Sequence, residues 1–344
     1  MKAVVVHGAG DVRIDERPRP QPARGEVLIA MEWGGICGSD VAYFRHGASG
    51  TASLAHPLVL GHEVAGRIAA VGPGVTGLAE GQPVTVHPAE LVGDGILPER
   101  IAGRTNLYPR IRYFGSAAFT PHTDGGFSEY RTVRAAQVRP LPDGVSTELG
   151  ALAEPLAVAL HAVGRVPELR GRTVLVNGAG PIGSLVVAAA RLCGAHSVVA
   201  ADVSEAPLTT ARLMGADETR DISRGKELPA DMDVVFEASG APAALGPVLR
   251  ATARGGIVVQ VGNLPGREVP SVLGDLVTRE ITWIGSYRFV DEIDDALAAL
   301  RDGLDISPVI SHRFPLEQAE RALGVAGDPS SGSGKVMLRL TAPA

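Results

Sequence analysis

The segment VLVNGAGPIG, residues 174–183, determines how the second half of the chain is expected to fold. Its apolar first half predicts a buried strand, and Gly178, Gly180 and Gly183 follow at the turn into a helix. In this pattern the first glycine permits a tight turn, the second lets backbone approach a pyrophosphate, and the third lets the helix pack closely on the strand. The phosphates would meet free N–H groups at the helix N-terminus. The segment therefore predicts a dinucleotide site.

The chain that follows this segment supports the same interpretation. From residue 172 apolar strands alternate with helices, which predicts a parallel sheet covered on both faces, a doubly wound α/β (Rossmann) domain. Asp202 ends the next strand, where a carboxylate binds the ribose hydroxyls of NAD and repels the 2′-phosphate of NADP. We expect NAD; the alternative is that Asp202 caps a helix. The expected cofactor contacts are Gly178, Gly180, Pro181, Ile182, Gly183, Asp202, Ser239, Gly262 and Asn263.

The first 150 residues have a different character. They are rich in Gly and Pro and contain short β-branched runs, which predicts an irregular, mostly β domain. After residue 290 two more helices and a last strand, KVMLRL, are expected. We therefore expect a β-rich catalytic domain at 1–150, completed by 290–344, and a nucleotide-binding domain at 151–289.

Composition narrows the class of protein. A chain of 344 residues suits two domains. The net charge of −6 and the lack of a basic run argue against nucleic acid or an anionic membrane as partner. No apolar run is long enough for a membrane span, and the N-terminus is too quickly polar for a signal peptide. Two cysteines, Cys37 and Cys193, cannot build a disulfide framework, so we expect a reducing, cytoplasmic setting.

Three segments carry candidate metal ligands: GGICGSD (34–40), LGHEVAG (60–66) and LAEPLA (152–157). Taken singly, Cys37 could be a small buried residue, His62 a core histidine and Glu154 an acid at a helix start. A catalytic zinc, however, takes three protein ligands with N, S or O donors and keeps one open position. Cys37, His62 and Glu154 supply one donor of each kind, which predicts a zinc site.

Two neighbouring acids are given lesser roles. Glu63 follows His62 directly, and adjacent strand residues point to opposite faces, so both reach one metal only if the backbone leaves strand geometry there. We therefore rank Glu63 below the other three, as a transient ligand or a residue behind them. Asp40 is expected to orient His62 through its other ring nitrogen.

With these motifs in place, the chain resembles the zinc-containing medium-chain dehydrogenase/reductase family. GGICGSD, LGHEVAG, AEPLAVALHA (153–162) and NGAGPIG (177–183) occur in the family's order. The polyol and sugar-acid branch fits best, because Glu154 stands where alcohol dehydrogenases usually have cysteine. RYFGSAAFTPHTDGGFSEY (112–130) and GSYRF (285–289) resemble the bacterial L-idonate 5-dehydrogenases within that branch.

The resemblance implies a reversible, NAD-linked oxidation of a small polyol or sugar acid by a homodimer or homotetramer with a GroES-like catalytic domain. Ser39 would accept a hydrogen bond from the substrate hydroxyl, and Arg288 could bind a sugar-acid carboxylate bidentately. The alternative for Arg288 is a surface or interface arginine. Two other functions stay open: an enzyme for another polyol, a cyclitol or an amino alcohol in a biosynthetic pathway, and a non-catalytic nucleotide-binding scaffold.

The sequence departs from the family at two places. The lobe that usually binds a second, structural zinc through four cysteines corresponds to residues 86–115, which contain no cysteine. We therefore expect one zinc per chain, no structural zinc, and a lobe held by packing of Tyr108, Tyr113 and Phe114. The family's proton-relay histidine is replaced by Ala42; His46 is the nearest substitute, and otherwise a solvated loop residue.

Overall fold

The computed structural model describes residues 1–223 and 225–341. The chain forms two compact units. Unit 1 contains Met1–Glu154, Ala296–Leu304 and the segment from Ile310 onward, and unit 2 contains Pro155–Asp295 and Asp305–Val309. The chain first leaves unit 1 after Glu154, where the sequence placed the boundary after residue 150.

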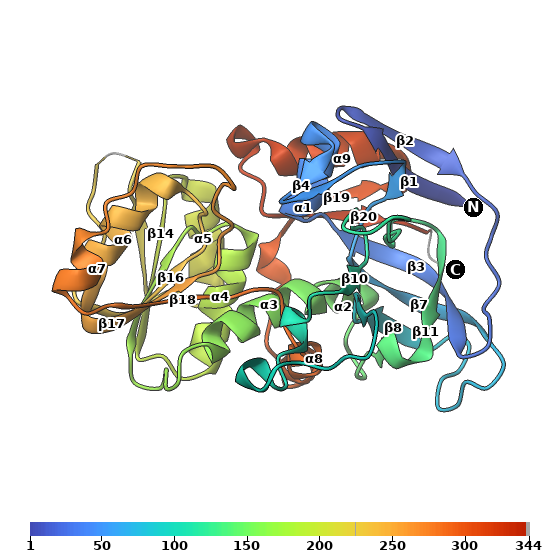
Figure 1. Cartoon of the computed structure of the whole chain (residues 1–344), viewed down its shortest axis with the longest axis horizontal. Helices are drawn as coiled ribbons and strands as arrows, with labels where there is room; N and C mark the ends of the chain where they lie inside the picture. Colours follow the sequence, from blue (N-terminus) through green and yellow to red (C-terminus); the bar gives the residue numbers. More distant parts are fainter. Residues whose placement is uncertain (224, 342–344) are drawn as a thin grey trace. The chain divides into compact units, whose positions relative to one another are not determined.

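Unit 1 is built on a seven-stranded sheet with β3 near its centre (Figure 1). On one side β3 pairs with β7, on the other with β20, and β11 pairs with it as well. The C-terminal strand β20 therefore completes the sheet that the N-terminal strands begin. The strands of this sheet are β3 (Glu26–Gly35), β7 (Glu63–Val71), β8 (Pro83–Val86), β11 (Tyr130–Arg134), β12 (Val138–Pro140), β19 (Ile310–Pro315) and β20 (Lys335–Arg339).

Smaller sheets and helices complete unit 1. The remaining strands are β1 (Lys2–Gly8), β2 (Asp11–Glu16), β4 (Ala48–Ser49), β5 (Ala52–Ser53), β6 (Leu58–Val59), β9 (Ala89–Leu91) and β10 (Ile111–Tyr113). The helices are α1 (Gly38–His46), α2 (Thr147–Ala151) and α9 (Ala319–Gly327). Two helices run from one unit into the other, α3 (Ala153–Gly164) and α8 (Glu292–Arg301).

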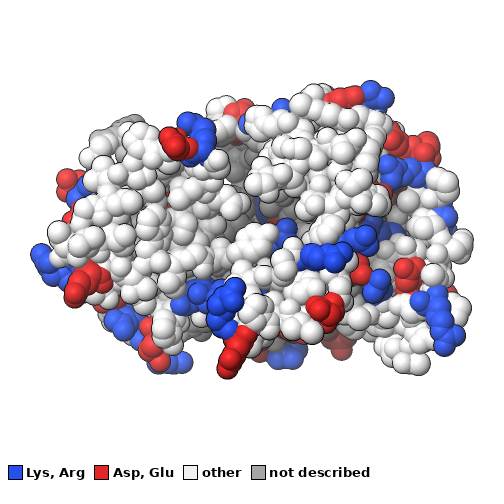
Figure 2. Space-filling view, viewed as in Figure 1, with Lys and Arg blue, Asp and Glu red and all other residues white. Residues whose placement is uncertain are grey.

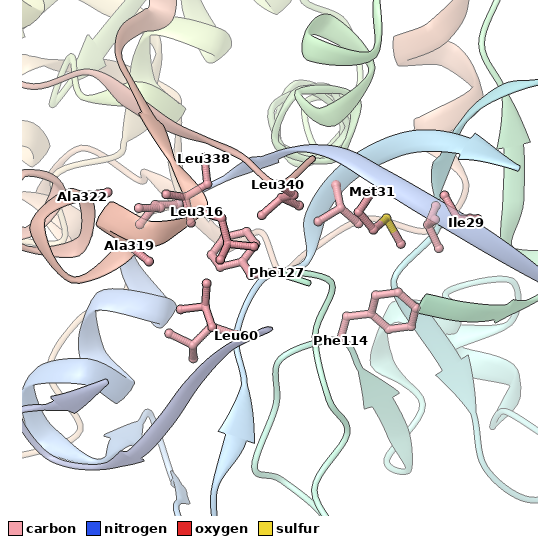
Figure 3. Packing of buried hydrophobic residues seen from close by; sticks show 14 of the residues in the cluster. Ile29, Met31, Leu60, Phe114, Phe127, Leu316, Ala319, Ala322, Leu338 and Leu340 are labelled. Carbon is pink, nitrogen blue, oxygen red and sulfur yellow. The ribbon is translucent and has the colours of Figure 1, made fainter. Parts of the chain in front are cut away.

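The core of unit 1 is organised around Phe127, which is completely buried. Its ring fills the space where a Cβ at Gly34 or at Gly61 would lie. Figure 3 shows Phe127 among cluster residues from distant parts of the chain, including Leu60 and Leu316. The core therefore depends on the two glycines for room, and it holds the segment around Gly61 in place.

The cysteine-free lobe is held by a small apolar cluster of its own. Tyr108, Ile111 and Tyr113 are buried together, and Ala89 and Leu91 pack against them. β9 and β10 pair in antiparallel fashion to form the frame of this lobe. Phe114, which was expected in the same group, belongs instead to the main core of unit 1.

Unit 2 is a six-stranded parallel sheet with strand order β15-β14-β13-β16-β17-β18. This confirms the doubly wound sheet predicted from the alternating strands and helices. Figure 1 labels β14, β16, β17 and β18 of this sheet. Residues of α6 pack on the face that carries Leu175 and Val235, and α4 contacts β13 and β14. The elements are β13 (Thr173–Asn177), α4 (Pro181–Leu192), β14 (Ser197–Asp202), α5 (Glu205–Leu213), β15 (Glu218–Asp221), β16 (Met232–Glu237), α6 (Leu245–Ala251), β17 (Thr252–Gln260), α7 (Gly274–Thr278) and β18 (Thr282–Gly285).

Short 3₁₀ helices connect these elements. They are η1 (Glu99–Ile101), η2 (Thr105–Leu107), η3 (Ala135–Gln137), η4 (Pro242–Ala244), η5 (Ser307–Val309), η6 (Leu316–Gln318) and η7 (Pro329–Ser331). In the part of the chain that the structure describes, no helix is long and apolar enough to cross a membrane. On the face drawn in Figure 2, basic and acidic side chains are interspersed.

The burial pattern predicts the outcome of a matched pair of substitutions in unit 1. Ile29→Ala, at a completely buried position, should lower the free energy of unfolding by about 2–5 kcal/mol, because it leaves a cavity in the core. Ile96→Ala, at a side chain that is 73% exposed, should change it by less than about 0.5 kcal/mol. Denaturant unfolding of both variants measures the difference. Equal effects would contradict the assignment of Ile29 to the core.

Candidate metal and cofactor sites

Asp40 joins the two segments that carry Cys37 and His62. One carboxylate oxygen of Asp40 accepts a hydrogen bond from the Cys37 N–H at 2.9 Å, and the other accepts one from the Gly61 N–H at 3.0 Å. The Asp40 side chain is completely buried. It was expected to orient the His62 ring, but its hydrogen bonds go to the backbone, and its effect on His62 is electrostatic.

The backbone around His62 lets two adjacent residues face one site. Gly61 has a φ of +95°, and β7 begins only at Glu63, so His62 lies outside regular strand geometry. A side chain at Gly61 would overlap the Phe127 ring. The condition under which both His62 and Glu63 could reach one metal is therefore met in the structure.

Cys37, His62 and Glu63 converge. A sulfur, a ring nitrogen and a carboxylate oxygen from these three residues all lie within 4.8 Å of one another. The Oε2 atom of Glu63 is buried and has no hydrogen-bond partner. One S, one N and one O donor, with a buried oxygen that has no other partner, fit a zinc ion. The sequence ranked Glu63 below Glu154, whereas among the described residues it is Glu63 that joins Cys37 and His62 in this group.

Lys335 holds the other oxygen of Glu63. Its Nζ donates to Glu63 Oε1 at 2.6 Å and to the carbonyl oxygen of Ile36 at 3.2 Å, and the lysine is only 3% exposed. Gly35 lies opposite Glu63 on β3, and a Cβ there would overlap the Glu63 carboxylate. Lys335 was not predicted from the sequence; the available signal was a lysine directly before three apolar residues, 336–338, which are buried.

Glu154 lies beside the three converging residues. It is 4% exposed, at the start of α3, and its Oε1 accepts a hydrogen bond from the Tyr113 hydroxyl at 2.6 Å. The Tyr113 ring contacts the His62 ring edge-on, with centroids 5.6 Å apart. Burial raises the pKa of Glu154, while His62 and the Tyr113 hydroxyl act to lower it.

The groups around His62 favour a positive charge at this place. Burial acts to lower the pKa of His62, but Cys37, Asp40 and Glu154 together raise it to about 10. An imidazole that keeps its proton in a buried place reports a strong demand for positive charge there. A divalent cation meets the same demand and takes the histidine as a neutral ligand.

The proposed proton path begins on α1. Ser39 is half-buried in the first turn of this helix, and His46 is its exposed last residue. They are seven positions apart in the helix, about 10 Å along its axis, so a proton cannot pass between them directly. Ala42 lies between them on the same side of the helix, where an imidazole would shorten the path.

The glycine-rich loop of unit 2 joins β13 to α4. Gly178 has a φ of +93°, and a Cβ there would lie 2.6 Å from the Ser239 backbone nitrogen. A Cβ at Gly183 would overlap the Gly178 carbonyl oxygen, whereas Gly180 has open space beside it. The loop thus offers an open, side-chain-free surface next to the start of α4, which begins with Pro181 and Ile182.

The other expected cofactor residues lie at the carboxyl ends of strands in the same unit. Asp202 ends β14, and its two oxygens accept from the Ala179 N–H at 2.7 Å and the Ser204 N–H at 3.0 Å. Ser239 follows β16, and Gly262 and Asn263 follow β17. The Gly240 backbone lies against those of Gly262 and Asn263. This edge of a parallel sheet is where α/β domains bind nucleotides.

Arg288 follows β18, also in unit 2. It has a φ of 51°, and its guanidinium lies 4.9 Å from the centroid of the Tyr287 ring.

Comparison with known proteins defines the class. Residues 23–143 match the alcohol dehydrogenase GroES-like domain, and residues 181–302 match the zinc-binding dehydrogenase domain. The chain belongs to the zinc-containing medium-chain dehydrogenase/reductase family, in which zinc and NAD(P) are the cofactors. The predicted family and the predicted GroES-like and Rossmann fold are thereby confirmed.

Particular relatives are dehydrogenases of polyols and sugar acids. The chain is 36% identical over 343 residues to L-idonate 5-dehydrogenase (NAD(P)(+)) of Escherichia coli, covering 98% of both chains. It is 37% identical over 355 residues to sorbitol dehydrogenase of Gallus gallus, and the match covers 98% of this chain and 96% of that relative. The crystal structure of L-idonate 5-dehydrogenase from E. coli matches with a TM-score of 0.91 and 35% identity, and the match covers 98% of this chain and 97% of that chain. A zinc-binding dehydrogenase from Sinorhizobium meliloti, bound to NADP, matches with a TM-score of 0.88 and 31% identity, covering 98% of each chain.

The ion pair between Lys335 and Glu63 predicts a large effect on stability. Lys335→Met should lower the free energy of unfolding of the metal-free protein by about 3–5 kcal/mol, because a buried carboxylate loses its cation. Added zinc should restore part of the loss, since binding to the folded state stabilises it. Denaturant unfolding with and without a chelator measures both effects.

The matched control is Lys2→Met, which removes the exposed partner of Glu317. It should change stability little, because exposed ion pairs are well solvated. A Lys335→Met variant as stable as Lys2→Met would contradict the assigned importance of the buried pair.

Proposed function

We propose that the protein is an NAD-dependent zinc dehydrogenase of carbohydrate metabolism that reversibly oxidises a secondary alcohol of a polyol or sugar acid, with L-idonate as the first substrate to test. The convergence of Cys37, His62 and Glu63 around an unpartnered carboxylate oxygen carries this proposal. The relatives, an L-idonate and several sorbitol dehydrogenases, support the substrate class.

Residues of unit 1 perform the proton chemistry of this reaction. Cys37, His62 and Glu63 would hold zinc, with Glu154 beside them, and a zinc bound there supplies a Lewis acid that polarises the substrate oxygen. Ser39, two residues after Cys37, accepts the hydrogen bond of the substrate hydroxyl through its Oγ. Water carries the proton onward to solvent, with the exposed His46 further along α1 as an acceptor. A nicotinamide bound in unit 2 would supply the acceptor for the hydride of the carbinol carbon.

The cofactor we propose is NAD rather than NADP. Asp202 places a carboxylate at the end of β14, where the adenosine ribose of a dinucleotide lies in this fold. A 2′-phosphate would meet a like charge there. Ser204, two residues further on, lies at the N-cap position of α5 and carries no positive charge to compensate.

One zinc per chain and a homodimeric or homotetrameric assembly complete the proposal. The lobe that lacks cysteines is packed by an apolar cluster that includes Tyr108 and Tyr113. β18 is an edge strand of the parallel sheet, and Val272 and Val277 nearby are 64% and 78% exposed. An unpaired edge beside exposed apolar side chains favours pairing with a second copy. Both cysteines are free thiols, which favours a cytoplasmic location.

One observation favours a second candidate, an enzyme for another polyol, a cyclitol or an amino alcohol in a biosynthetic pathway. Ala42 cannot carry a proton, so the relay differs from that of the family to which the relatives belong. The convergence of three potential ligands argues against a scaffold that only binds nucleotide.

A substrate panel tests the proposed function directly. The zinc-loaded protein should reduce NAD with L-idonate or sorbitol faster than with a cyclitol or threonine, as measured by NADH absorbance. If the substrate is a sugar acid, Arg288→Gln should lower kcat/KM by about 10-fold or more, because a charge-assisted bidentate hydrogen bond is worth about 1.5–3 kcal/mol. Turnover of sorbitol should be unaffected by that change. Preference for the cyclitol or threonine would favour the second candidate, and no turnover at all would refute the proposal.

Cofactor preference tests the role of Asp202. Asp202→Ala should lower the preference for NAD over NADP by more than about tenfold, because it removes a like-charge contact worth more than about 1.4 kcal/mol. The ratio of kcat/KM for the two cofactors measures it. Glu205→Ala, a nearby acid paired with Arg212, serves as control and should leave the ratio unchanged. The role of Asp202 is refuted if the wild-type protein uses both cofactors equally.

A further inference from the structure

Tyr113 belongs to two parts of the molecule at once. It ends β10, and it packs with Tyr108 and Ile111 in the apolar cluster of the cysteine-free lobe. The next residue, Phe114, already lies in the main core of unit 1. The position of Tyr113 is therefore set by packing on both sides, and its side chain is only 6% exposed.

The side chain of Tyr113 makes two contacts with the candidate metal site. Its hydroxyl donates to Glu154 Oε1 at 2.6 Å, and both groups are buried. Its ring lies edge-on to the His62 ring, at a centroid distance of 5.6 Å. A buried, charge-assisted hydrogen bond of this length is among the stronger ones in proteins. Glu154 is thus held by a residue whose own place is rigid.

This hydrogen bond bears on which carboxylate becomes a ligand. Glu63 and Glu154 both act electrostatically on the same buried site. Lys335 occupies Oε1 of Glu63 and leaves its Oε2 without a partner, within the group that Cys37 and His62 complete. Tyr113 occupies an oxygen of Glu154, and Glu154 is not part of that group of described residues.

We propose that Tyr113 is a positioning residue that keeps Glu154 out of the metal's ligand set and so preserves an open position for substrate. A catalytic zinc needs such a position, and a second carboxylate on the metal would fill it and weaken its Lewis acidity. Residues that orient the groups around a metal typically change affinity or activity by about 10- to 100-fold when they are removed. The inference rests on the proposed zinc site and adds to it the reason why one coordination position would stay open for substrate.

The lobe offers a matched control. Tyr108 lies in the same apolar cluster and is 8% exposed, close to the exposure of Tyr113. Its hydroxyl, however, contacts Val92, Asp94 and Gly95 within the lobe itself. A purely structural effect of losing a lobe hydroxyl should appear in both tyrosines, whereas a positioning effect should appear only in Tyr113.

The experiment compares Tyr113→Phe and Tyr108→Phe after replacement of zinc by Co²⁺, whose visible absorption reports coordination number. Tyr113→Phe should weaken the d–d bands, as the released Glu154 binds the metal and raises the coordination number. It should also lower kcat by about 10- to 100-fold with little change in the KM for NAD. Tyr108→Phe should leave the spectrum as in the wild type. In a Glu154→Ala background, Tyr113→Phe should have no further effect on the spectrum.

Several outcomes would overturn the proposal. It fails if Tyr113→Phe keeps the wild-type spectrum, if Tyr108→Phe changes it equally, or if the change persists without Glu154. Should Tyr113→Phe not fold, Glu154→Ala tests the premise: a wild-type spectrum shows that Glu154 stays off the metal, as the proposal requires, and a changed one shows that Glu154 is itself a ligand and overturns it. A wild-type protein that binds no metal refutes the zinc site itself, whereas metal binding with an unchanged Tyr113→Phe refutes only the role of Tyr113.

Discussion

The buried ion pair between Lys335 and Glu63 is the interaction on which the site depends. Glu63 begins β7 and Lys335 begins β20, and β3 lies between these two strands in the sheet. The pair can form because Gly35, on β3, leaves room for the carboxylate. Lys335 offsets part of the negative charge of the two glutamates, and a divalent cation can offset the rest. Without the C-terminal strand, these acids would lie buried together without compensation.

The backbone of the site is fixed by groups other than the three converging donors. Phe127 occupies the space beside Gly61, so that the chain turns there before His62. Asp40 binds the backbone nitrogens of Gly61 and Cys37, which ties the two ligand segments together. Tyr113 adds a third support from the lobe. The geometry of the donors therefore follows from core packing and from buried hydrogen bonds, which is how metal sites are preorganised.

The sequence predicted local and periodic features well. The alternation of strands and helices indicated the parallel sheet, and the spacing of Gly178, Gly180 and Gly183 indicated the loop between β13 and α4. The short, polar β15 carries little hydrophobic pattern and was not anticipated. Its pairing with β14 is a tertiary contact that overrides weak local preference.

Long-range features of the site could not be read from the sequence. Glu63 was ranked low because side chains alternate between the two faces of a strand. That alternation does not apply here, because Gly61 has a positive φ and the chain turns before Glu63. Lys335 lies far from Glu63 in the chain and meets it only through strand pairing. The contact of Tyr113 with Glu154 likewise depends on how the lobe packs. Each of these needed the fold before it could be seen.

The central proposal is that one zinc would be held by one sulfur donor and by nitrogen and oxygen donors, which would leave a position for substrate. X-ray absorption at the zinc edge, combined with elemental analysis of the purified protein, tests it most directly. The prediction is about one zinc per chain, one sulfur and otherwise light donors in its first coordination shell. Two zinc ions per chain, or a zinc without any sulfur ligand, would contradict it.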